Sequence, residues 1–229
     1  MAFHLPAALS TDDDSKALGY LRTYYGKSGG RPHTGAYFDE WAPHQDPDRF
    51  SAEDVLAVSF LSVFVPPMAA HKLLDAQADH FNDLLREIGP DRDLVTEEVP
   101  ADDTWTVRRL YSALLALHGI GPTTASKLVA RKRPRLVPIY DSVVGQVTDG
   151  RVAFWEPLRV HLREADGALH ARLLRLKEDA GLADSVSAIR VFDVIAWMEG
   201  KDRNLKLQLP DETIGAELAT ADMGAQDAP

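Results

Sequence analysis

The stretch LHGIGPTTASKLV, residues 117–129, decides how this chain folds and contains its most informative motif. The pattern predicts a helix that ends near His118, a tight turn, and a second helix that begins near Pro122. Gly119 and Gly121 can take positive φ and let the backbone approach a ligand closely. Proline suits the first helical position, because its fixed φ is helical and its missing N–H would have no partner there. The second helix would present free N–H groups and the positive end of its dipole, which together suit a phosphate.

The charge around this turn differs from that of the whole chain. The chain has 25 basic and 35 acidic residues and a net charge of −10, which by itself disfavours nucleic acid as a partner. The window from Trp105 to Tyr140 has seven basic residues and no acidic one. Its net charge is therefore +7, and the rest of the chain has a net charge of −17. Such a run is usually a solvated helix face, but beside a phosphate-binding turn it is typical of a nucleic-acid footprint. We expect the second helix to have an inward apolar face (Ala125, Leu128, Val129) and an outward face formed by Thr124, Lys127 and Arg131.

Hydrophobic periodicity predicts an all-α fold. We expect one helical domain over residues 1–208, with a helical hairpin at 105–133, and a flexible acidic tail over 209–229. A strongly apolar helix over 55–65, stopped by Pro66 and Pro67, should be central and buried. Further helices are expected to end near residue 25 and to span 68–88, 154–165, 168–179 and 186–199, with a strand-like approach and a short helix over 137–148.

The composition excludes several classes of site. With no cysteine, the chain has no disulfide, no thiol nucleophile and no thiolate-bound zinc or iron–sulfur cluster. No apolar run approaches 18 residues and no secretory signal is visible, so we expect a cytoplasmic protein with no membrane partner. His71, Asp75 and Asp79 have a spacing that could hold a metal, but such a row is more often an exposed polar face. We therefore expect no metal and no cofactor.

Two groups of residues are candidates for lining a pocket. Residues 26–47 are expected to form an ordered loop, whose polar and aromatic side chains either line a pocket or cover the core. In this loop the candidates are Arg31, His33, Tyr37, Phe38, Asp39, Glu40 and Trp41. The aromatic residues that could stack on an extruded base, or equally belong to the core, are Trp41, Trp105, Tyr111 and Tyr140.

A second motif, VPIYDSVV at residues 137–144, comes directly after the basic helix. The first motif reads hydrophobic, Gly, hydrophobic, Gly, three variable residues and Ala, and the second contains Pro-x-x-Asp. Together they closely resemble the helix-hairpin-helix DNA glycosylases. The resemblance covers roughly residues 114–147, about 15% of the chain, and indicates a divergent bacterial member of that superfamily.

The resemblance implies that Asp141, eighteen residues after Thr123, is the catalytic carboxylate. Bifunctional members carry a lysine nucleophile two residues after the second glycine, where this chain has Thr123. The histidine usually found two residues beyond the aspartate is replaced by Val143, and an arginine often found further on is Gln146. What remains resembles a monofunctional glycosylase, or a descendant that kept the scaffold and lost the chemistry.

The chemistry of Asp141 can also be argued without the resemblance. Breaking an N-glycosidic bond builds positive charge on the sugar, and a nearby carboxylate stabilises that charge and can activate water. Asp141 directly precedes Ser142, so it could also be a helix N-cap, and both roles can hold together. The expected partner is duplex DNA, held through its phosphates. The residues expected to contact DNA are Gly119, Gly121, Thr123, Thr124, Lys127 and Arg131.

Three other interpretations stay open at this stage. The chain could be a non-catalytic nucleic-acid-binding protein that uses the same hairpin. It could hydrolyse the N-ribosyl bond of a small nucleoside or nucleotide, which would suit the acidic remainder of the chain. It could also be a structural domain in which the hairpin only connects helices. The substrate base and the oligomeric state are left open.

Overall fold

The computed structural model describes residues 3–43, 45–150 and 154–205, and all regular structure within these ranges is helical. The prediction of an all-α fold is therefore confirmed, whereas the tail predicted for 209–229 lies outside the described residues. Short 3-10 helices cover Ala7–Leu9 and Leu94–Thr96. The α-helices are α1 (Ser15–Tyr24), α2 (Ala36–Glu40), α3 (Ala52–Ser59), α4 (Pro67–His71), α5 (Ala78–Ile88), α6 (Thr106–Leu115), α7 (Pro122–Lys132), α8 (Ser142–Thr148), α9 (Trp155–Asp179) and α10 (Ala188–Asp202).

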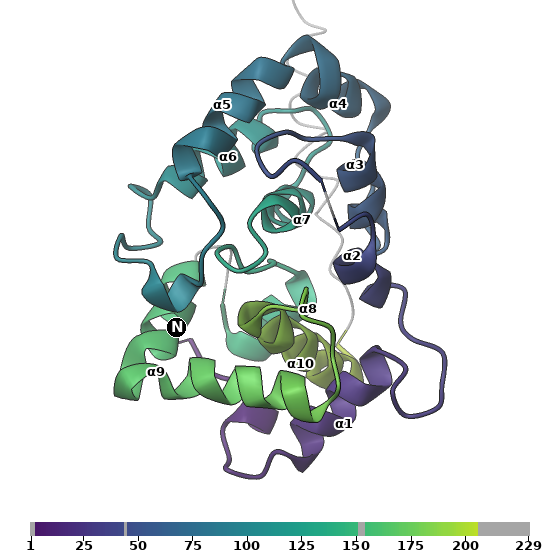
Figure 1. Ribbon diagram of the computed structural model, residues 1–229, viewed down its shortest axis with the longest axis vertical. Helices are drawn as coiled ribbons and strands as arrows, with labels where there is room; N and C mark the ends of the chain where they lie inside the picture. The colour runs from purple at the N-terminus through teal and green to yellow at the C-terminus, as the bar shows by residue number, and fades with distance from the viewer. Residues whose placement is uncertain (1–2, 44, 151–153, 206–229) are drawn as a thin grey trace, which may run out of the picture.

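Helix α7 lies at the centre of the molecule, with other helices around it (Figure 1). Helices α3 and α6 pack directly against α7, and α5 packs on α6. On the other side, α10 packs against α1, α8 and α9. All residues from 124 to 130 are buried, so this part of α7 has no solvent-exposed face. The centre of the fold is thus the helix for which the sequence predicts an exposed basic side.

Helix α3 begins where its N-cap predicts and ends earlier than expected. Ser51 and Asp54 form a capping box, in which each backbone N–H is bound by the other residue's side chain. The helix ends at Ser59 rather than near residue 65. The carbonyl of Leu61 accepts a hydrogen bond from Nζ of Lys127 at 2.8 Å. This carbonyl therefore binds a side chain, and not a backbone N–H that would continue the helix. The expectation of a helix buried all round is also wrong, because Leu56 is 45% exposed.

Two other predicted helices are interrupted. The helix expected over 68–88 is divided into α4, a π-helical segment (Lys72–Ala76) and α5. The chain has no glycine or proline between 68 and 88, so local sequence gave no signal of this break. Helix α9 contains a non-helical stretch at residues 164–167, where Ala165, Asp166 and Gly167 take positive φ. That break agrees with the two helices predicted over 154–165 and 168–179.

The core contains two of the aromatic residues considered for base stacking. The indole of Trp155 packs edge-on against Trp105 at 5.7 Å and Tyr111 at 5.2 Å, measured between ring centroids. Its Nε1 donates a hydrogen bond to the carbonyl of Pro138 at 2.9 Å. Trp105 and Tyr111 are both buried. Their large apolar surfaces stabilise the packing between α6 and α9, so neither is available to a ligand.

Candidate functional site

The glycine-containing turn joins two helices, as predicted, but α6 already ends at Leu115 and Gly121 has a φ of −92°. Helices α6 and α7 flank it, and Pro122 is the first residue of α7. Gly119 takes a φ of +80°, and a Cβ built there would lie 2.7 Å from Cγ of Pro66. Gly121 is the N-cap, with no side chain bound to the N–H groups of the first turn. The backbone N–H groups at Thr123 and Thr124 therefore have no side-chain cap among the described residues, and phosphate binding by this turn stays a prediction.

The outward basic face predicted for α7 is wrong. Lys127 and Thr124 are buried, and the Arg131 side chain is 10% exposed. Arg131 donates to Asp54 at 3.2 Å and to the carbonyls of Phe38 at 3.0 Å and of Trp41 and Ala42. Because the central position of α7 leaves it no solvent side, these cations bind groups inside the protein.

The other basic residues of the window 105–140 are also paired. Lys132 binds the same Asp54 carboxylate at 2.9 Å, and Arg133 is fully buried against Asp48. Arg108 lies over the Trp155 ring, with its guanidinium carbon 4.3 Å from the centroid. Six of the seven basic residues form ion pairs with acids from outside the window, so its +7 is largely compensated. The six are Arg109, Lys127, Arg131, Lys132, Arg133 and Arg135.

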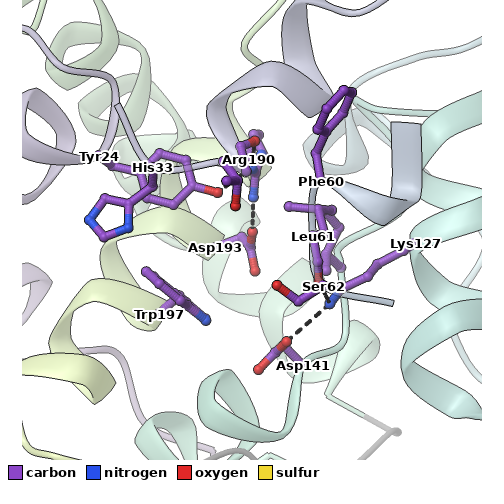
Figure 2. Close-up of a pocket in the computed structure, with 13 residues that line it drawn as sticks. Tyr24, His33, Phe60, Leu61, Ser62, Lys127, Asp141, Arg190, Asp193 and Trp197 are labelled. Carbon is purple, nitrogen blue, oxygen red and sulfur yellow. Dashed lines mark hydrogen bonds and ion pairs between the residues drawn. The ribbon is translucent and has the colours of Figure 1, made fainter. Parts of the chain in front are cut away.

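A cavity of about 130 Å³ lies between α7 and α10, and Asp141 is in its wall (Figure 2). Several segments distant in sequence form this wall, among them the loop of residues 60–66 between α3 and α4, called here the α3–α4 loop. Pro66 of the same loop packs on Gly119, so the loop connects the cavity to the hairpin turn. The lining side chains used below are Tyr24, His33, Phe60, Leu61, Ser62, Lys127, Asp141, Arg190, Asp193 and Trp197.

Both carboxylate oxygens of Asp141 have partners. Oδ2 lies 3.1 Å from Nζ of Lys127, and Oδ1 accepts a hydrogen bond from the backbone N–H of Val143 at 2.9 Å. Asp141 is thus the N-cap of α8 and lines the cavity as well. An ammonium group and a helix N-terminus both compensate its negative charge.

A second cluster of charged groups, centred on Arg190, borders the same cavity. The Arg190 guanidinium binds both oxygens of Asp39 at 2.9 and 3.0 Å and also donates to Tyr24 Oη at 2.9 Å. Its remaining amino group contacts Asp193. Burial raises the pKa of Asp193 to about 6; Arg190 opposes the shift, while nearby Asp141 adds to it. Burial also raises the pKa of Tyr24 to about 12.

Aromatic rings form the remaining part of the wall. His33 stacks on Tyr24 with centroids 5.4 Å apart, and Trp197 meets both rings edge-on. Burial and nearby Lys201 lower the pKa of His33, which favours a neutral imidazole. These three rings thus pack on one another and together line one side of the cavity. Of the candidates in the 26–47 loop, His33 lines this cavity. The other candidates of that loop do not line it, nor does the stacking candidate Tyr140; these loop residues are Arg31, Tyr37, Phe38, Asp39, Glu40 and Trp41.

Sequence reasoning missed Arg190, Asp193 and Trp197. Their spacing of i, i+3 and i+7 places them on one face of α10. Two charged residues inside the apolar run of residues 188–196 were the signal that could have found them, because a charge in a buried helix needs a partner.

Other expectations concern metals and membranes. The described residues contain no group of three or more His, Asp or Glu side chains arranged to hold a metal ion. His71 and Asp75 approach to 3.4 Å, and both side chains are more than half exposed. Within the described part of the chain, no helix combines the length and apolar character needed to cross a membrane.

Comparison with known proteins gives a family. No curated protein and no solved structure matches the chain. The family described as "Family of unknown function (DUF6308)" matches residues 17–200, which include the hairpin and every residue of the cavity wall. Because this match covers most of the sequence, the chain belongs to the DUF6308 family.

Proposed function

We propose that the protein is a monofunctional N-glycosylase that removes a base from DNA, with Asp141 as its catalytic carboxylate. The observation that carries this proposal is the position of Asp141, whose compensated carboxylate lines a cavity with aromatic walls. As the C1′–N bond breaks, its electron pair leaves with the base and positive charge develops on the sugar. Asp141 stabilises that charge and accepts a proton from the water whose oxygen bonds to C1′.

The size of the cavity supports a base as the group that enters it. Sites for drug-sized ligands usually measure roughly 300–1,000 Å³, whereas this cavity measures about 130 Å³. A single planar ring system suits that space better than a whole nucleotide does. The sugar and its phosphates would then stay at the entrance, as they must when a base is extruded from a polymer.

The hairpin turn provides a place for a phosphate near this cavity. Backbone N–H groups of Gly119, Gly121, Thr123 and Thr124 are the donors proposed for it, because the first turn of α7 has no side-chain cap. The α3–α4 loop spans the distance between the two features, with Ser62 in the cavity wall and Pro66 against Gly119. Lys127 and Arg131 take no part in this contact, since their cations are bound inside the protein.

The same geometry favours direct hydrolysis without a covalent lysine intermediate. A lysine nucleophile needs an amine that is free to attack the sugar, whereas Nζ of Lys127 is held by Asp141 and the Leu61 carbonyl. Thr123 offers no amine. Water is therefore the proposed nucleophile, and a cytoplasmic location is part of the same proposal.

The test is release of free base from a panel of duplexes that each carry one damaged or modified base. We expect the wild-type protein to release at least one of these bases, and Asp141→Asn to reduce the rate by about 100-fold or more. Asp149→Asn is the matched control, because it makes the same chemical change at the other end of α8, on a side chain that is 53% exposed. Equal rates for Asp141→Asn and Asp149→Asn would remove Asp141 from the mechanism.

One observation favours a second candidate, hydrolysis of free nucleosides. The paired basic side chains leave few cations for a polyanionic duplex on a chain with a net charge of −10. A free nucleoside needs no phosphate contacts. Base release from nucleosides alone, with none from the duplex panel, would establish this candidate in place of the first.

A further inference from the structure

The buried groups around the cavity contain one more carboxylate than they have cations. Asp39, Asp141 and Asp193 face Lys127 and Arg190, and each of these five side chains is 7% exposed or less. If all five were ionised, the cluster would carry a net negative charge in a region of low dielectric, which is unfavourable. One of the three carboxyl groups is therefore suited to hold a proton.

The contacts identify which carboxyl group this is. Asp141 has its own cation in Lys127, and Asp39 has both oxygens bound by Arg190 as well as a hydrogen bond from Tyr25 at 2.9 Å. Asp193 has only one donor among the described residues, an amino group of the arginine that already neutralises Asp39. Asp193 is the surplus carboxylate.

Asp193 also lies in the wall of the cavity, where a bound base can take its proton. It borders the cavity from α10, while Asp141 borders the same space from the N-terminus of α8 (Figure 2). Asp193 faces Arg190 on its own helix, Asp141, and Lys127 on α7. The Tyr24 hydroxyl and Asp39 bind to the same Arg190 guanidinium. Burial raises its pKa to about 6, with Asp141 acting in the same direction.

We propose that Asp193 is the general acid that protonates the departing base, while Asp141 acts on the sugar and the water. This inference rests on the proposed function and adds a substrate class to it: bases that leave as anions unless they are protonated. Two carboxyl groups in one cavity with different charge environments are suited to divide these roles.

In the proposed step the C1′–N bond breaks and its electron pair goes to the base, which takes the Asp193 proton at a ring nitrogen or a carbonyl oxygen. The water oxygen bonds to C1′, and the water proton goes to Asp141. Solvent then returns a proton to Asp193 and removes one from Asp141, so the net reaction consumes one water and releases a neutral base.

A comparison of two duplex substrates tests this role. One carries a neutral modified base, and the other carries N7-methylguanine, which is already cationic and leaves without protonation. We expect Asp193→Asn to reduce release of the neutral base by about 100-fold and release of the cationic base by less than about 3-fold. A similar loss on both substrates would show a structural role for Asp193, and no loss on either would exclude it as the acid.

The pH dependence of the wild-type protein gives a second test that needs no variant. Release of the neutral base should fall about tenfold per pH unit above about 6, because the proton on Asp193 is lost, whereas release of the cationic base should not. Parallel profiles would overturn the inference and leave the proposed function standing. If the wild-type protein released no base from the whole duplex panel, the proposed function itself would fail and this inference with it.

Discussion

Replacing Lys127 by methionine should destabilise the protein strongly, because the change leaves the Asp141 charge buried without its cation. Nζ of Lys127 lies 3.1 Å from Asp141 Oδ2 and 2.8 Å from the Leu61 carbonyl, and 3% of the side chain is exposed. Removing one partner of a buried ion pair costs about 3–5 kcal/mol. An exposed phosphate-binding lysine would instead change stability by about 0.5 kcal/mol or less.

The double variant Lys127→Met with Asp141→Asn separates the ion pair from packing. Asparagine can still accept the Val143 N–H bond, and no uncompensated charge remains, so the main loss is the unpaired Leu61 carbonyl, about 1–3 kcal/mol. We expect the double variant to be more stable than Lys127→Met alone.

Urea unfolding followed by circular dichroism at pH 7 measures these free energies. The matched control is Lys16→Met, because Lys16 pairs with Asp202 on the surface, with both side chains more than half exposed. This control should change the free energy of unfolding by about 0.5 kcal/mol or less. A buried ion pair between Lys127 and Asp141 is ruled out if Lys127→Met costs no more than the control, or if the effects of Lys127→Met and Asp141→Asn simply add.

Two further predictions concern stability. Gly119→Ala should lower the free energy of unfolding by about 1–3 kcal/mol, because alanine at a φ of +80° is strained and its Cβ would meet Pro66 at 2.7 Å. Gly121→Ala is the control and should lower it by about 1 kcal/mol or less, because Gly121 has a φ of −92° and open space around it. Equal losses in urea unfolding would contradict the turn geometry. The Asp193 carboxyl binds its proton more tightly in the folded protein than in the unfolded chain, because its pKa rises from 3.8 to about 6. The stability it contributes is therefore fully present below pH 4 and is lost as the pH rises through 6, a change of about 3 kcal/mol that Asp193→Asn should lack. Unfolding free energies measured from pH 4 to 8 that run parallel for wild type and variant would refute this.

Local features of the fold could be predicted from the sequence. The glycine turn, the proline at the start of α7, the capping box of α3 and the N-cap role of Asp141 all depend on residues a few positions apart. The break in α9 was predicted for the same reason, since the apolar periodicity stops and restarts around Gly167.

The charge of the basic window could not be interpreted from the sequence alone. Its acid partners come from distant positions: Asp54 lies 77 residues before Arg131, and Asp48 lies 85 before Arg133. A local count of +7 says nothing about which cations remain exposed once the chain folds. For this reason the prediction of an outward basic face with Lys127 and Arg131 was wrong.

The cavity was only half predictable. Asp141 follows from a local motif, but the opposite wall comes from α10, with Asp193 and Trp197 more than 50 positions further along the chain. Trp197 joins the cavity wall only through its contacts with Tyr24 and His33, near the other end of the chain, and Asp193 acquires its raised pKa only through burial and its charged neighbours in the fold.

In the proposed function, the Asp141 carboxylate promotes cleavage of an N-glycosidic bond. The most direct measurement is the single-turnover rate of base release from the best duplex substrate, for wild-type protein, Asp141→Asn and Asp149→Asn, each first shown to be folded by circular dichroism. We expect Asp149→Asn to match the wild type and Asp141→Asn to be slower by about 100-fold or more. A folded Asp141→Asn variant that releases the base at the wild-type rate would contradict it.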